Sequence, residues 1–327
     1  MAENLPEKSQ QTAPTGKSNI TARVLSWVQK AGPFLISLSD VASDQFAKHK
    51  GKVAAQEALA QVFLEEHKAA LRVKEEILKR LPDAAETGRA EIRMRLGEVD
   101  KHLRTVEILA KAVPEIARLE EIAGSAEADT RELSDHWMDH FIHLSSSKNE
   151  PWRKDLLARA LAIETSKPGT IRAKDLWSIG TLSEQEFHAL AHMLDVSTYF
   201  VDGPMVPNLP GNFMNTPIEK CQLHDCPHYG NICVVLLEAN LIHPVTDVGG
   251  PIKNFDEFEK SVVQYCGRSY EVEFPAGFSV RGLHFTALGG TLARLYIPTP
   301  NEVGTGIFEA FISTLKAKGI SVVPVQL

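Results

Sequence analysis

The chain has 327 residues, of which 43% are hydrophobic, enough to build two domains with ordinary buried cores. Its 35 Lys and Arg residues against 42 Asp and Glu residues leave a formal net charge of −7, which argues against a general nucleic-acid-binding protein. Residues 1–20 are polar and lack an apolar core. We therefore expect a disordered tail there, rather than a signal peptide or a packed element.

The longest apolar run near the N-terminus covers residues 24–38. It is broken by Gln29-Lys30 and by Gly32-Pro33, and it is shorter than the roughly 20 residues that a membrane-spanning helix needs. The run predicts a buried helix with a proline break, in a cytoplasmic chain without a transmembrane segment. Contact of residues 24–38 with a membrane surface is the alternative.

Residues 21–124 are predicted to form a helical hairpin or coiled-coil region, with two long helices in its second part. Residues 52–81 carry apolar side chains along one helical face, and Pro82-Asp83 ends that helix. The next helix has the steps of four and three residues that are typical of a heptad seam, at Ile92, Leu96, Val99, Leu103, Val106, Ala110 and Val113. This pattern predicts an antiparallel, coiled-coil-like hairpin. The seam could equally pair with another subunit, and we expect a homo-oligomer.

After the seam, Pro114 is expected to bend or interrupt the helix, and residues 124–130 are predicted to be a linker. A helical module follows over residues 131–199. One of its helices is predicted to stop at Pro168-Gly169, and Ser183 with Glu186 predicts a capping box that opens a later one. The apolar residues of this module predict a core without a pocket, formed by Trp137, Phe141, Leu157 and Leu161.

Histidines lie at helical spacing in the same module. His136, His140 and His143 would share one helix face next to Asp139, and His188 and His192 repeat the four-residue spacing. Such an arrangement can bind a metal or a phosphate. We interpret these histidines as surface or partly exposed helix residues, because the spacing brings no clear carboxylate anchor.

Several segments of the chain resemble an uncharacterised bacterial family of unknown function. The likeness rests on motifs at Trp137 and Phe141, Leu157–Glu164, Pro168–Ile171 and Leu182-Ser183, with weaker echoes at Leu236–Ile242 and Phe285–Gly289. It covers about half of the chain. Similar helical modules occur in bacterial abortive-infection proteins. The resemblance therefore implies a role in anti-phage defence, by analogy of fold.

A lobe of mixed α and β structure is predicted for residues 200–327. Its first part, residues 200–231, is rich in proline, glycine and asparagine and predicts a long irregular loop or an inserted lobe. The sequence CQLHDCPHYGNIC supplies five soft metal ligands within thirteen residues: Cys221, His224, Cys226, His228 and Cys233. Four such ligands could close around a zinc ion. The spacing matches no common zinc finger, so unpaired thiols, with Cys233 packed as a small hydrophobe, are the alternative. A disulfide is disfavoured in a reducing cytosol.

The rest of this lobe alternates helices and strands. A buried helix over residues 232–239 is followed by two strands, 270–274 and 279–285, that we expect to pair with each other, and by a helix over 286–295. This order suggests a small winged-helix-like lobe. A helix over 306–318 and a strand over 320–325 follow. The predicted fold is thus mostly α, with a long N-terminal hairpin, a middle helical module and an α+β lobe.

The sequence contains no G-x-S-x-G nucleophile elbow, no H-E-x-x-H zinc helix and no G-x-G-x-x-G dinucleotide-binding motif, although catalytic activity is left open. We expect a non-enzymatic defence component, a sensor or adaptor, that contacts a protein partner or effector encoded nearby. One alternative is a winged-helix-like transcriptional regulator, against which the acidic balance counts. The other is a zinc-dependent enzyme centred on residues 221–233.

Overall fold

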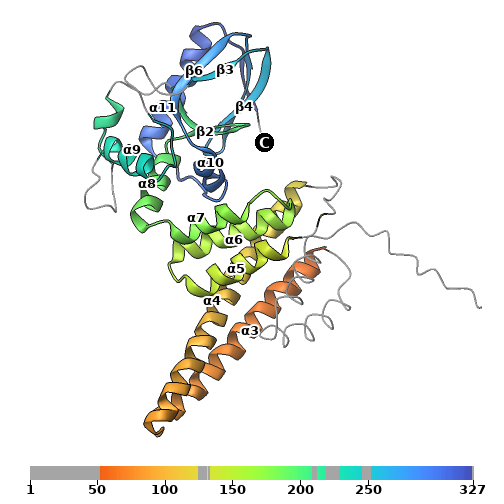
Figure 1. The fold of residues 1–327 in the computed structure, drawn as a ribbon. Coiled ribbons are helices and arrows are strands. Elements are labelled where there is room, and N and C mark those ends of the chain that lie inside the picture. The colour runs from red at the N-terminus through yellow and green to blue at the C-terminus, as the bar shows by residue number, and fades with distance from the viewer. Residues whose placement is uncertain are drawn as a thin grey trace, which may run out of the picture. The chain divides into compact units, whose positions relative to one another are not determined.

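The structure, a computed structural model, describes residues 52–123, 131, 133–207, 212–218, 228–244 and 252–325. The predicted tail 1–20, the apolar run 24–38 and the linker 124–130 lie outside the described residues. The chain is mostly helical with an antiparallel sheet in its C-terminal part, and it divides into two compact units, residues 1–172 and 173–327 (Figure 1). Among the described residues, no helix is both long and apolar enough to cross a membrane.

The first unit begins with two long helices, α3 (Lys52–Arg80) and α4 (Glu86–Ala123), which lie side by side in opposite directions (Figure 1). The seam between them includes Leu59, Phe63 and Val106, all at most 1% exposed. Two polar contacts also join the helices, between His102 Nε2 and Glu66 Oε1 at 2.6 Å and between Lys74 Nζ and Asp100 Oδ1 at 2.7 Å.

Pro114 was predicted to bend or interrupt the second helix, and the interruption is wrong, because α4 continues through Pro114 to Ala123. Proline removes one backbone donor and crowds the preceding turn, which costs stability but does not forbid a helix. Here Pro114 is exposed, whereas its neighbours Val113 and Ile116 are buried. The packing of these neighbours favours continuation of the helix.

Two further helices, α5 (Asp135–Ser147) and α6 (Pro151–Ser166), pack on the C-terminal half of α4. The predicted core residues of this region are confirmed, since Trp137, Phe141, Leu157 and Leu161 are at most 3% exposed. The predicted module 131–199 is nevertheless divided between the two units. The reason is packing: α5 and α6 bury their apolar faces against α4, whereas the helices after residue 172 pack against elements of the second unit.

The turn after α6 is held by the carboxylate of Glu164, which is 3% exposed. Its two oxygens accept hydrogen bonds from the backbone N–H groups of Gly169, at 2.6 Å, and Ile171, at 2.8 Å. Gly169 adopts a φ of 87°, which a residue with a side chain rarely takes. Glu164, Gly169 and Ile171 belong to the motifs that carry the family resemblance, and here they have a structural role.

The second unit begins with α7 (Ala173–Thr181) and α8 (Glu184–Leu194). The predicted capping box at the start of α8 is confirmed: the Glu186 N–H donates to Ser183 Oγ at 3.1 Å, and the Ser183 N–H donates to Glu186 Oε2 at 2.6 Å. The remaining helical elements of this unit are a short 3-10 turn η2 (Phe213–Asn215), α9 (Tyr229–Glu238), α10 (Ala287–Ala293) and α11 (Glu302–Ala317).

An antiparallel seven-stranded sheet with the order β3-β6-β2-β1-β4-β5-β7 forms the rest of the second unit's described structure. The strands are β1 (Thr198–Phe200), β2 (Gly203–Pro207), β3 (Ile252–Phe255), β4 (Glu259–Tyr265), β5 (Arg268–Phe274), β6 (Phe278–His284) and β7 (Val322–Val325). Strand β2, the turn η2 and the first residues of α9 lie in the stretch 200–231 that was expected to be an irregular loop, so that expectation is wrong for these residues.

The predicted pairing of the strands now called β5 and β6 is wrong. β5 pairs with β4 and β7, and β6 pairs with β2 and β3. A two-residue turn at Cys266-Gly267, with φ of 43° and 83°, joins β4 directly to β5 and so fixes that pair. The sheet is larger than the predicted lobe and its strands are arranged differently. The structure therefore does not confirm a winged-helix-like fold.

Aromatic side chains fill the core between this sheet and α11. Phe200, Phe255, Phe274, Phe308 and Phe311 are at most 6% exposed and belong to one cluster. The rings of Phe255 and Phe274 stack with centroids 3.9 Å apart, although their strands β3 and β5 are far from each other in the strand order. The sheet therefore curls around its core.

Candidate functional site

The predicted zinc loop lies largely outside the described residues. Of its five candidate ligands, Cys221, His224 and Cys226 fall there, while His228 directly precedes α9 and Cys233 lies within it. Burial raises the pKa of the Cys233 thiol to about 11, which favours the protonated form over the thiolate that binds zinc. This supports the alternative role of Cys233 as a small buried hydrophobe. The zinc site stays a prediction.

The histidines of α5 lie on its surface, as expected from their spacing. His136 and His143 are exposed, and His140 is half-buried. The structure brings two of them together, because the Nε2 atoms of His136 and His140 are 3.3 Å apart and their rings meet edge to face with centroids 4.5 Å apart. The same helix buries Trp137 and Phe141 on its other side, and the centroids of their stacked rings are 5.4 Å apart.

The second histidine pair, on α8, has a different environment. His188 Nε2 lies 3.7 Å from a carboxylate oxygen of the exposed Glu184. His192 is half-buried, and its burial, followed by the charge of His188, lowers its pKa. These contacts agree with the interpretation of partly exposed helix residues.

A polar cluster that the sequence does not predict joins the end of α8 to β4 and the start of α11. The carboxylate of Asp195 accepts hydrogen bonds from the Tyr296 hydroxyl at 3.0 Å and from the Thr299 N–H at 2.7 Å, and burial raises the pKa of Asp195. The Tyr265 hydroxyl accepts from the Asn301 N–H at 3.1 Å and lies 3.0 Å from the Asp195 carbonyl oxygen, to which it can donate.

Close packing around this cluster argues for a structural role. A Cβ atom at Gly304 would overlap the Tyr265 hydroxyl and lie 2.7 Å from the carbonyl oxygen of Asp195. The partners are mostly backbone groups, which stay fixed, so the cluster holds three elements together. No local sequence signal could have found it, because its hydrogen-bonded partners lie 36 to 104 residues apart in the chain.

The hairpin of the first unit carries exposed apolar side chains. Leu64, Leu71 and Leu78, which we call the leucine line, are 46%, 40% and 43% exposed and recur every seven residues on α3. Leu59, Phe63 and Ala70, which face α4, are at most 7% exposed. Residues seven apart on a helix lie nearly in line along its surface. The leucine line is therefore a second apolar stripe, distinct from the seam.

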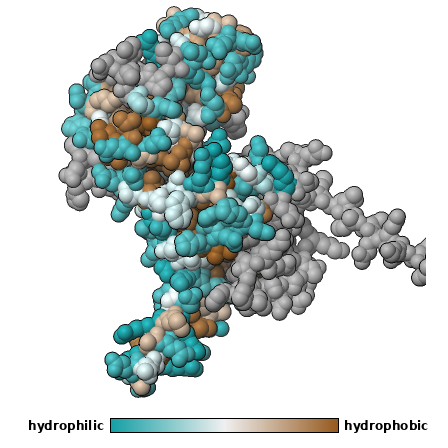
Figure 2. All heavy atoms as spheres, in the orientation of Figure 1, coloured by the Kyte–Doolittle hydropathy of each residue, from teal (hydrophilic) through white to brown (hydrophobic). Residues whose placement is uncertain are grey.

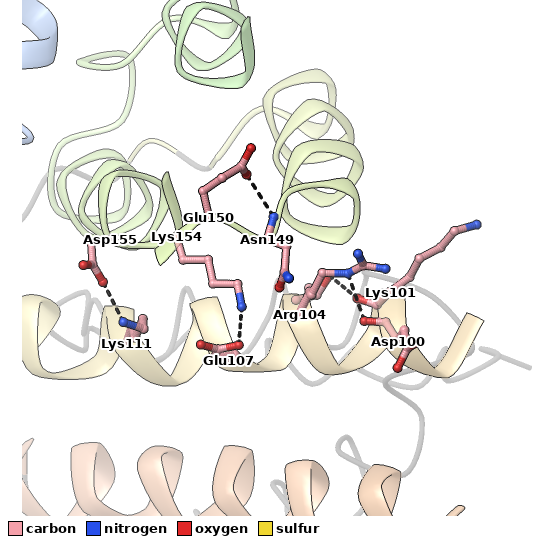
Figure 3. Close-up of polar contacts among 10 residues, drawn as sticks. Asp100, Lys101, Arg104, Glu107, Lys111, Asn149, Glu150, Lys154 and Asp155 are labelled. Atoms are coloured by element: carbon pink, nitrogen blue, oxygen red, sulfur yellow. Dashed lines mark hydrogen bonds and ion pairs between the residues drawn. The ribbon is translucent and has the colours of Figure 1, made fainter. Parts of the chain in front are cut away.

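Two charge pairs join the C-terminal half of α4 to α6 (Figure 3). Lys154 Nζ lies 2.6 Å from Glu107 Oε2, and Lys111 Nζ lies 2.7 Å from Asp155 Oδ1. These contacts fall on α4 beyond Arg104. The outer part of the hairpin, residues 66–103, which we call the arm, extends past α5 and α6 within the first unit (Figure 1). Figure 2 shows hydrophilic and apolar atoms mixed along the arm.

No protein-family model matches the chain, and neither a curated protein nor a solved structure does. The resemblance to the bacterial family therefore stays an expectation from the sequence.

Proposed function

We propose that this protein is a non-enzymatic assembly or adaptor component of bacterial anti-phage defence, and that the leucine line of α3 is its contact surface with a second copy of the chain. The observation that carries the proposal is the exposure of three leucines at heptad spacing. The defence setting comes from the family resemblance. In this account the coiled-coil-like hairpin assembles the protein, and the second compact unit contacts a protein partner or effector.

The seven-residue period favours a second helix of the same kind as the occupant. A line of leucines at one heptad position forms a straight apolar stripe, and an identical stripe from another copy is its natural complement. Lys68 and Glu75, both exposed, follow Leu64 and Leu71 by four residues, so charged side chains alternate with the leucines on this face. Charges beside an apolar seam set the orientation and register of two helices.

The size of the stripe decides how tight such an association would be. Full burial of one leucine side chain contributes about 1.5–3 kcal/mol, so a leucine that is less than half exposed can gain about 1 kcal/mol. Three leucines from each of two copies then gain about 6 kcal/mol, near the lower end of the roughly 4–15 kcal/mol that association costs. The contact is therefore expected to be weak and to depend on protein concentration.

The test is the mass of the full-length protein by light scattering over a range of concentrations up to tens of micromolar. Leu71→Glu places a charge in the middle of the leucine line and should shift the protein to a lower mass without changing its melting temperature. Met94→Glu is the matched control, because Met94 is 64% exposed on the other helix of the hairpin. A wild-type protein that is monomeric throughout, or a Leu71→Glu variant with the parental mass, would contradict the proposed contact.

The defence role needs a separate measurement. Phage should form fewer plaques on cells that express the protein with its neighbouring genes than on cells that lack it. Leu71→Glu should remove most of that protection. Protection that is absent with the wild-type protein against a broad phage panel would contradict the defence role. The proposed contact surface would then still be tested by the mass measurement alone.

A further inference from the structure

The pair of histidines on α5 has the dimensions of a metal chelate. A zinc ion bonds to imidazole nitrogens at about 2.0–2.1 Å, and a tetrahedral angle at the ion separates two such nitrogens by about 3.3–3.4 Å. The Nε2 atoms of His136 and His140 are 3.3 Å apart. We propose that His136 and His140 form a two-histidine site for a divalent transition-metal ion of the class that imidazole prefers, namely Zn²⁺, Ni²⁺ or Cu²⁺.

The helix orders the backbone of both histidines before an ion binds. α5 is anchored on its buried side by Trp137, Phe141 and Leu144, each at most 3% exposed, so the backbone between the two histidines is already ordered. Residues four apart on a helix lie one above the other on the same face. The backbone therefore loses little entropy when an ion binds. His140 exchanges contacts that it makes in the ion-free protein for a bond to the ion.

The proton balance of binding is simple. In the ion-free pair, the two Nε2 atoms are close enough to share a hydrogen bond, in which one ring donates and the other accepts. When an ion binds, the donor ring moves its proton from Nε2 to Nδ1 through solvent, and both Nε2 lone pairs face the ion. Two neutral imidazoles bind the cation in this way without net release of a proton.

The surroundings of the pair favour a cation and leave room for other ligands. Asp135 and Asp139 are exposed on the same helix, and their negative charges lie within one turn of the histidines. In the part of the chain that the structure describes, no group of three or more His, Cys, Asp or Glu side chains is arranged around one point. The described residues thus supply two ligands, and in the proposed site water or an external ligand takes the remaining positions.

The experiment is a calorimetric titration of the full-length protein with NiCl₂ or ZnCl₂ alone. Cys221→Ser and Cys226→Ser are introduced into the parent, so that the predicted cysteine loop does not contribute. In this background, His136→Ala and His140→Ala should each raise the Kd at least tenfold. His243→Ala is the control, because His243 is exposed in the second unit, and it should change the Kd less than twofold.

A spectroscopic readout separates ligation from an indirect effect on folding. With one equivalent of Cu²⁺, the parent should show the electron paramagnetic resonance pattern of nitrogen ligands, and His140→Ala should lose part of it while keeping the parental circular dichroism spectrum. The proposal is overturned if the parent binds none of these ions. It is equally overturned if the two α5 variants bind as tightly as the parent, or if His243→Ala weakens binding as much as they do.

Discussion

The two halves of α4 differ in how much of their apolar surface is buried. In the inner half, Ile108, Leu109 and Ile116 are at most 1% exposed, because α3, α5 and α6 surround the helix. In the arm, Ile92, Leu96 and Val99 are only half-buried along a single seam. This inner half of α4, together with α5 and α6, which we call the base, therefore provides most of the packing that stabilises the first unit. The arm leaves apolar surface that folding does not require, which is the property expected of a contact surface.

The largest expected effect comes from truncating a buried side chain in the base. Leu157, fully buried on α6, should lose about 2–5 kcal/mol of unfolding free energy when it is replaced by alanine, because a cavity remains. Leu96→Ala in the arm should cost about 1 kcal/mol or less. Urea denaturation of both variants measures the difference. Equal costs would show that the arm is packed as tightly as the base.

A second change in the base acts through hydrogen bonds. Glu164→Ala removes the acceptor of the Gly169 and Ile171 N–H groups, and an unsatisfied buried donor costs about 1–3 kcal/mol. Glu164→Gln, which keeps one acceptor oxygen, should lose less. Thermal melting and hydrogen exchange at residues 169–171 report the effect. A melting temperature unchanged in Glu164→Ala would mean that the carboxylate does not hold this turn.

The smallest expected effect is pH-dependent. The Arg153 guanidinium, which is paired with Glu150, lowers the pKa of that carboxyl from about 4.5 to about 2. Since the folded pKa lies below the unfolded one, the pair stabilises the fold fully above about pH 4.5. The contribution is lost as the pH falls towards 2. Glu150 is mostly exposed, so the effect should stay below about 1 kcal/mol.

The control for this prediction is an ion pair in the arm. Arg95 and Glu91 lie 2.7 Å apart, and both side chains are about 60% exposed. Urea midpoints at pH 5 and pH 3 should converge between wild type and Glu150→Gln as the pH falls, whereas Glu91→Gln should follow the wild type at both values. A constant gap between wild type and Glu150→Gln would contradict the role assigned to this pair.

Features set by local spacing could be predicted from the sequence. The helix over residues 52–81, the capping box of Ser183 and Glu186, and the buried Trp137 and Phe141 follow from periodicity and cap chemistry. The pairing of β5 and β6 was predicted wrongly because alternation identifies a strand but not its partner. β7, which pairs with β5, lies about 50 residues further along the chain.

In the candidate sites, too, some features could be predicted from local spacing and others could not. The four-residue spacing of His136 and His140 predicts one shared helix face, but the 3.3 Å separation of their nitrogens depends on side-chain rotamers that the sequence does not specify. Of the apolar face predicted for α3, Leu59, Val62, Phe63 and Ala70 are buried, but Val73 is 47% exposed. The exposure of Leu64, Leu71 and Leu78 became visible only when α4, α5 and α6 were placed, because spacing alone does not tell which stripe is covered.

The central claim, that the leucine line joins two copies, is tested most directly by a distance between spin labels at position 71. Leu71 is the middle leucine, so it faces its own equivalent in a parallel pair and in an antiparallel pair centred on it. The four native cysteines are first replaced, and Leu71→Cys carries the label.

Double electron–electron resonance at tens of micromolar should then give a short inter-copy distance at position 71. Labels at position 64 distinguish the two orientations: they should be close in a parallel pair, but about 20 Å further apart along the axis in an antiparallel one, because a helix rises 1.5 Å per residue. Labels at Met94 serve as the control and should be more distant than those at 71. Dipolar signals absent at both 71 and 64, with the protein folded, would contradict the account.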